Sequence, residues 1–334
     1  MKLTLLLLTL TSCAALAATE EQTNKTFQVQ PGGKLVVDVD FGSIDVTTNA
    51  NATDAVTVSV WRKVTRGSEA EEQKYLSENP VVFVQDGNTV TVRAHSKDKE
   101  KFHWFGGLKN RNEGKYTIQV PAQFNAQLNT SGGGIAASDV IGEVKADTSG
   151  GGLRFARLHG PLNGDTSGGG IHVTDCEGQI KIDTSGGGIE VTGGSGTLNG
   201  DTSGGSIIVK NFKGPASVDT SGGGITIENV AGKIKGDTSG GSIHAMLLSP
   251  LPGDVSLSTS GGGVTVQVPA NAAFNLDAEA VGGGVSCDLP VTVQGKRERD
   301  ELKGPVNGGG PVMHLETSGG GVHVEKLKPV ESGE

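Results

Sequence analysis

One short motif recurs along the middle of the chain and limits what the chain can fold into. It begins with Asp or Asn, continues Thr-Ser-Gly-Gly and ends in an aliphatic residue, as in Asp165 to Ile171. Seven copies, eighteen residues apart, begin at Asn129, Asp147, Asp165, Asp183, Asp201, Asp219 and Asp237. Looser copies follow around Thr259, Ala280 and Thr317. A fixed period of this length is the signature of a repeat architecture in which each unit stacks on the next.

Within each eighteen-residue unit, apolar and polar residues alternate in two short runs. If the Asp is position one, apolar residues occupy positions seven, nine, twelve and sixteen, with mostly polar or small residues between them. An alternation of period two is typical of β-strands. Glycines occupy positions four to six and position fourteen, where turns need them. Each unit is therefore expected to form two short strands and two turns.

Strands this short bury an apolar face only when equivalent residues of successive units stack. Stacked strands lie about 4.8 Å apart, and each strand then pairs with its copies on both sides. The sequence therefore predicts an all-β fold, a single-stranded parallel β-solenoid of eighteen-residue coils, about 45 Å long for ten coils. Right-handed winding is the default for parallel crossover connections.

One short helix is expected near the N-terminal end, over Glu69 to Asn79. Ser68 and Glu71 have the spacing of a capping box, and Pro80 follows the helix. Strand-like segments surround it at residues 34–39, 44–47, 56–61, 81–84, 89–94 and 116–120. The helix is predicted to cover the N-terminal end of the solenoid, because open strand edges invite aggregation.

These patterns divide the chain into four parts. Residues 1–17 are expected to be a signal peptide, 18–128 an irregular N-terminal part of the solenoid that includes the covering aromatic loop 102–105, and 129–326 the regular solenoid. The regular part is predicted to contain a charged loop at 289–311, and residues 327–334 are a tail. The segments 116–124 and 264–274 both place Val-Pro-Ala between strands, so they are predicted to be the same variant of the coil.

The signal peptide is predicted from Lys2, the apolar run Leu3 to Leu10 and a small-residue cleavage site ending at Ala17. The mature chain would begin at Ala18, and the protein would be exported to the periplasm or the cell surface. Lipidation of Cys13 after a short lipobox is the alternative. The apolar run is about half of the ~20 residues that a membrane-spanning helix needs, and no later segment is longer, so no transmembrane helix is predicted.

Charge and cysteine content narrow the range of partners. The formal net charge is −9 and becomes −10 when Lys2 is removed with the signal, and no basic run is long enough to follow a phosphate backbone. Nucleic acid is therefore not an expected partner. Cys176 and Cys287 stand where other coils carry apolar residues, so they are predicted to be buried and, six coils apart, too distant for a disulfide.

The Asp-Thr-Ser-Gly-Gly-Gly-Ile coils, together with Val39 to Val46 and Tyr116 to Pro121, resemble the toast-rack family, whose members are described as candidate adhesins. The resemblance covers roughly residues 25–326. It implies repeated short strands and a location outside the cytoplasm. It implies no assigned biochemical activity.

The Asp that opens each coil forms the most prominent candidate site. The six residues are Asp147, Asp165, Asp183, Asp201, Asp219 and Asp237. Stacked one coil apart, their carboxylates could bind calcium. In the structural interpretation, which we favour, each Asp accepts amides of its own turn, and Lys145, Lys181 and Lys235 offset the repulsion. The calcium rolls of repeat-in-toxin proteins place Asp after the glycines and in both turns, unlike this chain.

No catalytic or cofactor site is predicted. The threonines at position two, Thr148 to Thr238, are expected to face inward, and no His recurs beside the Ser and Asp residues as a catalytic triad requires. His103, His314 and His323 lack the spacing of metal ligands. A carbohydrate-active enzyme would need acidic and basic residues to converge in segment 294–303. We therefore expect a non-catalytic, adhesin-like or structural protein of the cell envelope, with an envelope protein or polysaccharide as partner; a calcium-dependent scaffold is the alternative.

Overall fold

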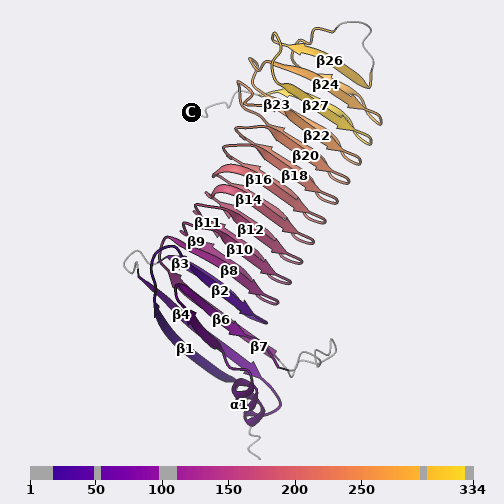
Figure 1. The fold of residues 1–334 in the computed structure, drawn as a ribbon. Coiled ribbons are helices and arrows are strands. Elements are labelled where there is room, and N and C mark those ends of the chain that lie inside the picture. The colour runs from indigo at the N-terminus through magenta and orange to yellow at the C-terminus, as the bar shows by residue number, and fades with distance from the viewer. Residues whose placement is uncertain (1–17, 49–53, 98–110, 294–298, 328–334) are drawn as a thin grey trace, which may run out of the picture.

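The computed structural model describes residues 18–48, 54–97, 111–293 and 299–327, which form an elongated stack of short strands (Figure 1). The predicted signal peptide with Cys13, the aromatic loop 102–105 and tail residues 328–334 lie outside the described residues. Two sheets of fourteen strands each, sheet A and sheet B, face each other, and their inward side chains form one continuous core. No helix in the described part of the chain is both long and apolar enough to cross a membrane.

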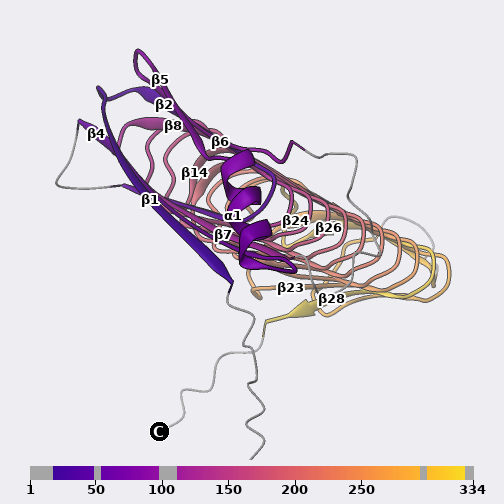
Figure 2. The ribbon, with the colours of Figure 1, turned by 90° about the horizontal axis from the view of Figure 1, so that it is seen from below.

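The strands of each sheet follow one another along the rod from its N-terminal to its C-terminal end. In this order sheet A contains β1 (Thr19–Gln28), β4 (Ala55–Thr65), β7 (Arg111–Val120), β3 (Ser43–Thr48), β9 (Ile135–Ser138), β11 (Leu153–Ala156), β13 (Ile171–Thr174), β15 (Ile189–Thr192), β17 (Ile207–Lys210), β19 (Ile225–Glu228), β21 (Ile243–Met246), β23 (Val264–Val268), β28 (Val322–Lys326) and β25 (Val285–Cys287). Sheet B contains β5 (Val82–Asp86), β6 (Thr89–Ala94), β2 (Gly33–Val39), β8 (Phe124–Thr130), β10 (Val144–Thr148), β12 (Leu162–Thr166), β14 (Glu177–Thr184), β16 (Ser195–Thr202), β18 (Ala216–Thr220), β20 (Ile234–Thr238), β22 (Val255–Thr259), β27 (Val312–Thr317), β24 (Phe274–Ala280) and β26 (Glu301–Val306). The helix α1 (Glu69–Glu78) lies across the N-terminal end (Figure 2).

The regular coils stack with the eighteen-residue register that the sequence predicts. In sheet B Asp147 pairs with Asp165, and in sheet A Leu153 pairs with Ile171, both in parallel strands. The apolar positions point inward, and Ile171 and Val173 are at most 1% exposed. The predicted β-solenoid is therefore confirmed.

A buried threonine fastens each turn to the coil before it. The hydroxyl of Thr166 donates to the carbonyl of Gly151 in the preceding coil at 2.7 Å and accepts the amide of Gly169 in its own turn at 3.4 Å. The same pair of contacts recurs at Thr148, Thr184, Thr202, Thr220 and Thr238. The predicted inward position of this column is confirmed, and its hydroxyls bind glycine backbone rather than one another.

At both ends of the rod, the coils are not stacked in the order of the sequence. Near the C-terminus, β27 lies between β22 and β24, and β28 lies between β23 and β25. The last coil is therefore enclosed, and the strands β24, β25 and β26 that precede it in the sequence form the outer end. At the other end, β2 lies between β6 and β8, and β3 lies between β7 and β9. The coil 33–48 is enclosed in the same way.

The two Val-Pro-Ala segments are the links that make this arrangement possible. The link from β7 to β8 passes the enclosed coil of β2 and β3, and the link from β23 to β24 passes that of β27 and β28. Each link therefore advances two coil positions instead of one. The sequence indicates that the two segments are alike, and the structure shows what they share.

Antiparallel strands close both ends, which a purely parallel solenoid does not predict. β4 pairs antiparallel with β1 and β7, β5 pairs with β6, and β26 pairs with β24. The prediction of a charged loop over residues 289–311 is wrong for residues 301–306, which form β26. Leu302 and Val306 are buried on the inner face of this strand while Lys303 points outward, so the strand covers the core despite its charges.

The helix begins at Glu69, as the sequence predicts, and ends one residue earlier than predicted, at Glu78, with Asn79 as its C-cap. The Ser68 hydroxyl accepts the amide of Glu71 at 3.4 Å, whereas the Glu71 carboxylate accepts the amide of Gly67 at 3.2 Å instead of that of Ser68. Glu72 faces inward and accepts the amide of Arg66 at 2.9 Å and the hydroxyl of Thr19 at 2.7 Å. These hydrogen bonds hold the pKa of the Glu72 carboxyl below its usual value. The helix is thereby tied to the beginning of β1.

Arg62, on β4, is a buried cation beside this helix. The residue is 1% exposed, its Nε donates to Glu21 at 3.0 Å, and its Nη1 donates to the Asn79 carbonyl at 2.7 Å.

Arg62→Ala leaves both acceptors without this donor, so we expect the free energy of unfolding to fall by about 2 kcal/mol. Chemical denaturation measures the loss. Lys63→Ala removes only an exposed pair with Glu20 at 3.7 Å and should change stability by less than about 0.5 kcal/mol; equal losses would contradict the role of Arg62.

His95 ties the end of β6 to β2 in a pH-dependent way. Its Nδ1 lies 2.8 Å from Asp40 and its Nε2 lies 3.0 Å from Asp38. The hydrogen bond to Asp40, helped by Asp38, raises the pKa of His95 although burial opposes the shift. This contribution to stability is fully present below the unfolded pKa of about 6.5 and is lost as the pH rises through the higher folded value. We expect His95→Gln to destabilise the protein more at pH 6 than at pH 8.5 in denaturation curves, and a loss that is independent of pH would contradict this assignment.

Candidate functional site

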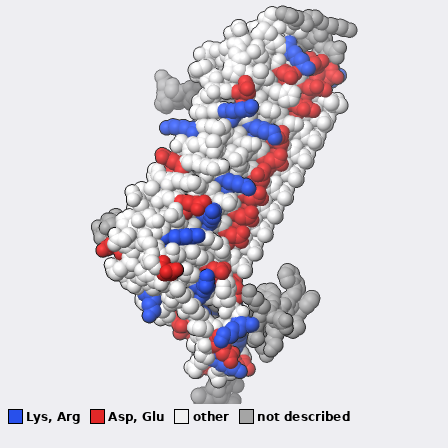
Figure 3. Space-filling model, in the orientation of Figure 1, with Lys and Arg blue, Asp and Glu red and all other residues white. Residues whose placement is uncertain are grey.

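The six aspartates of the repeat form a continuous column on the outer face of sheet B. Each pairs in register with the next across β10, β12, β14, β16, β18 and β20. The same register adds Asp38 near one end and Glu316, Glu279 and Glu301 at the other. Figure 3 shows this stripe of carboxylates along one edge of the rod. The sequence period identified the six aspartates, and its looser copies place Glu279 and Glu316 at the same position, whereas Asp38 and Glu301 were missed.

Burial and, after it, like charges raise pKa values within this column. Burial, followed by the neighbouring Asp165, raises the pKa of Asp147, and burial with Asp183 and Asp219 does the same for Asp201. Lys235 binds Asp237 at 2.7 Å, as expected, whereas Lys145 binds Glu143 at 2.9 Å. Among the described residues, no aspartate of the column accepts an amide of its own turn. The amide of the second glycine in each turn donates to the threonine hydroxyl instead. The predicted role of the aspartates in the turns is therefore wrong.

Histidine, cysteine and acidic residues do not gather into a metal centre in the part of the chain that the structure describes. There, no group of three or more such residues is close enough to hold an ion. His314 lies 3.0 Å from Asp277 in a charged network at the C-terminal end, and His323 lies on β28. His103 lies outside the described residues.

One serine touches a histidine. Ser286 Oγ on β25 lies 2.8 Å from Nδ1 of His323 on β28, and both side chains are exposed on sheet A. In the described residues no carboxylate hydrogen-bonds this imidazole, so the third member of a triad is not in place. The sequence period could not find this contact, because it depends on the enclosed position of the last coil.

The two cysteines are far apart. Cys176 is 1% exposed, and burial raises the pKa of its thiol. Cys287 is half-buried rather than buried. β13 and β25 are separated by seven coil steps, one more than predicted, because β28 lies between β23 and β25. At about 4.8 Å per step, the ~34 Å separation far exceeds the ~7 Å limit of a disulfide.

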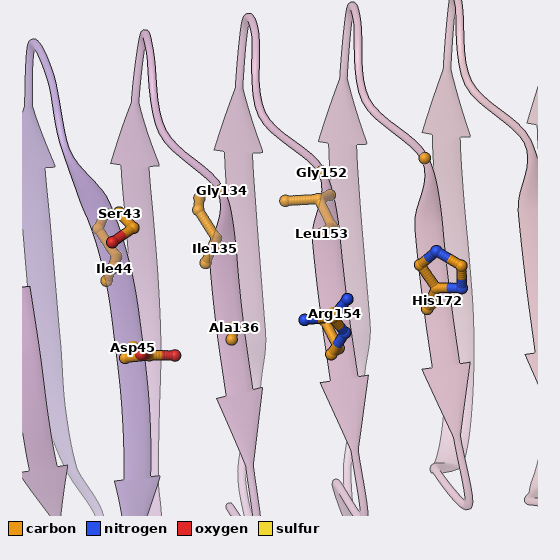
Figure 4. Close-up of a pocket in the computed structure, with 11 residues that line it drawn as sticks. Ser43, Ile44, Asp45, Gly134, Ile135, Ala136, Gly152, Leu153, Arg154 and His172 are labelled. Atoms are coloured by element: carbon orange, nitrogen blue, oxygen red, sulfur yellow. The ribbon is translucent and has the colours of Figure 1, made fainter. Parts of the chain in front are cut away.

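A shallow hollow lies on the outer face of sheet A, across β3, β9, β11 and β13. It has a volume of about 420 Å³, within the range of ~300–1,000 Å³ common for ligand sites. Figure 4 shows its floor, where position eight of successive coils carries Asp45, Ala136, Arg154 and His172. Position six contributes Ser43 and then Gly134, Gly152 and Gly170, so the rim beside the last three coils has no side chains. A second, smaller hollow of about 230 Å³ continues past Arg154 and His172 to Glu190.

The charges around the hollow leave one cation without a partner. Asp45 binds Lys115 at 3.6 Å, and Nδ1 of His172 binds Glu190 at 3.2 Å. Arg154 is exposed and makes no hydrogen bond or ion pair with any described residue. Sequence periodicity does not single out Arg154 or His172, because the residue at position eight varies from coil to coil.

Stacked eighteen-residue coils, two facing sheets and closed ends define the class of this molecule, a parallel β-solenoid repeat protein. The chain belongs to the Toastrack DUF4097 family, whose model matches residues 34–325. No curated protein is similar enough in sequence to match it.

Solved structures with a similar arrangement come from several bacteria. A "putative cell adhesion protein" from Clostridium sporogenes is 14% identical with a TM-score of 0.22, and the match covers 92% of this chain and 100% of that one. A "putative adhesin" from Bacteroides fragilis is 12% identical with a TM-score of 0.30, covering 92% and 97%. A "putative lipid binding protein" from Parabacteroides distasonis is 12% identical with a TM-score of 0.35, covering 92% and 97%. No ligand or partner is carried over from similarities this low.

Proposed function

We propose that this chain is a non-catalytic binding protein of the cell envelope, which contacts an envelope protein or polysaccharide with the outer face of sheet A. The observation that carries the proposal is the hollow over β3, β9, β11 and β13, where Arg154 stands without a partner among the described residues on a regular and well-packed support. An exposed guanidinium that no neighbour neutralises is available to a ligand. Support from rigid strands keeps such a site in a fixed geometry.

Export to the periplasm or the cell surface is part of this proposal. It rests on the signal-peptide pattern of residues 1–17, and attachment through a lipid on Cys13 is its variant. Intact-mass measurement of the exported protein decides between the two, because cleavage after Ala17 and lipidation of Cys13 give different masses.

The proposal is tested by sedimenting the mature chain from Ala18 onward with isolated bacterial envelopes. We expect the wild-type chain to sediment with the envelopes and Arg154→Gln to remain largely in solution. Binding that is equal for the two proteins would remove the outer face of sheet A as the contact surface. No sedimentation of the wild-type chain would overturn the proposal itself.

A calcium-dependent scaffold is the second candidate. The stacking of the six aspartates in register favours it. Burial, followed by repulsion between neighbours, raises the pKa values of Asp147 and Asp201, and a bound cation would relieve the repulsion. Calorimetry with calcium tests this candidate on the mature chain. A lack of binding heat together with an unchanged melting temperature would eliminate it.

A further inference from the structure

Serine side chains at position six of the coil show which kind of atom the backbone amide at this position can bind. Most coils carry glycine there, but three carry serine, namely Ser43, Ser206 and Ser242, and the last two show what the amide of the next coil binds. The Oγ of Ser206 accepts the amide of Gly224 in the next coil at 3.3 Å, and the Oγ of Ser242 accepts the amide of Gly263 at 3.3 Å. The amide at this position therefore binds an oxygen atom on the outer face, between two coils.

Over β9, β11 and β13, which form most of the hollow, this oxygen is missing, and only the β3 end carries a serine, Ser43. Position six is glycine in these three consecutive coils, namely Gly134, Gly152 and Gly170, and none of these residues has a side chain to offer. The amides of Gly152 and Gly170 have no acceptor among the described residues, and both glycines are exposed or half-buried. Successive coils are about 4.8 Å apart, so the hollow presents a row of free N–H donors. Rows of backbone amides of this kind bind anions.

Arg154 adds a positive charge at the centre of this row. It lies on the same strand as Leu153, two residues after Gly152, and is free of protein partners in the described structure. In the next coil, Nδ1 of His172 is engaged with Glu190, which leaves Nε2 without a hydrogen bond in the described part of the chain. A guanidinium next to N–H donors matches a carboxylate, which accepts several hydrogen bonds at once.

The two ends of the hollow carry acidic side chains, in contrast to the basic Arg154 at its centre. Asp45 lies two coils from Arg154 on one side and Glu190 lies two coils away on the other, each about 10 Å distant by strand spacing. Carboxylates there can accept hydrogen bonds from hydroxyl groups. Among the described residues, the lining offers no Phe, Tyr or Trp and no protruding apolar anchor of the kind that a bound peptide uses.

We propose that the hollow binds a carboxylate-bearing polysaccharide, with the carboxylate on Arg154 and the amides of Gly152 and Gly170 and neighbouring sugar hydroxyls on Asp45 and Glu190. This inference rests on the proposed function and specifies its ligand. The binding site would then lie on sheet A alone, over β3, β9, β11 and β13.

The test is calorimetric titration of the mature chain with an oligogalacturonate, without added calcium. We expect binding, and a loss of affinity of at least about tenfold in Arg154→Gln, which removes the charge. Gly134→Ser should weaken binding to a similar extent, because its hydroxyl would accept the Gly152 amide as Ser206 accepts that of Gly224. The new Cβ would lie 3.1 Å from the nearest atom, close to the 3.0 Å found for the same change at Gly224.

Two matched variants control for charge and for the new hydroxyl. Lys210→Gln removes a cation from the same face outside the hollow, and Gly224→Ser adds a serine at position six of a distant coil. Both should bind within about twofold of the wild-type chain. Unchanged binding by Arg154→Gln and Gly134→Ser, or an equal loss in the two controls, would overturn the proposal.

Two further ligands decide the chemical class. A neutral galactose oligomer should not bind, and inorganic phosphate should compete poorly with the oligogalacturonate. Equal competition by phosphate would show a general anion site and would overturn the saccharide assignment. If envelopes sediment the wild-type chain and not Arg154→Gln, while the oligogalacturonate fails to bind, the proposed function stands and this inference falls.

Discussion

Replacing Gly151 with alanine should destabilise the rod by about 3 kcal/mol or more. A Cβ at this position would overlap the carbonyl oxygen of Gly133 in the preceding coil, and that oxygen already accepts the Thr148 hydroxyl. Neither group can move, because both belong to turns that are stacked on both sides. Urea denaturation followed by circular dichroism measures the loss.

The neighbouring residue provides the control. Alanine at Gly150 would place its Cβ 3.6 Å from the nearest atom, the carbonyl oxygen of Ser131, which is ordinary contact. We expect Gly150→Ala to change stability by less than about 0.5 kcal/mol. Similar midpoints for the two variants would mean that the turns are not packed as closely as the structure shows.

Deletion of residues 312–334 should release β24, β25 and β26 from the rod, although their own residues are all retained. The enclosed strands β27 and β28 hold β24 and β25 to the rest of the rod, so without them β24 and β26 remain as a two-stranded hairpin. Such a hairpin is at best marginally stable in water. We expect amides of residues 274–280 to exchange hydrogen with an opening free energy of about 0 kcal/mol.

A shorter deletion separates this effect from general damage to the terminus. Removal of residues 328–334 leaves β27 and β28 complete and should leave exchange at Leu276 and Ala278 unchanged. Persistent protection of these amides after deletion of 312–334 would show that the last coil is not enclosed.

The regular coils were predictable because their periodicity is strict. Once Asp147 and Asp165 are equivalent, stacking fixes which residues face inward, and the buried threonines follow from the same parity. β1 was not predictable in this way. Its sequence from Thr19 to Gln28 is mostly charged or polar, and the strand is held by main-chain pairing with β4 rather than by an apolar face.

The order of coils at the ends could not be predicted from periodicity. The sequence of a Val-Pro-Ala link does not show whether the next strand lies one or two coils further along the rod. The strand that fills the intervening coil comes from a distant part of the chain. The predicted interval of six coils between Cys176 and Cys287 failed for this reason. Pairing partners that are remote in sequence leave no local pattern.

The hollow was missed for a related reason. A repeat directs attention to residues that recur in every coil, such as the aspartates, whereas Arg154 occurs once and histidine only three times at a variable position. The alternation of glycine with serine at position six was visible in the sequence. Its meaning needed the structure, because it is the Ser206 contact that shows what an amide at this position binds.

The enclosed coils at both ends also bear on how such a chain can change its length during evolution. Between residues 144 and 246 successive coils pair in a constant register of eighteen residues, so duplication or loss of eighteen residues by recombination leaves both ends untouched. Each event would change the reach of the rod by about 4.8 Å. The end segments, in contrast, must be inherited whole, since a crossover within either would separate an outer strand from the coil that holds it.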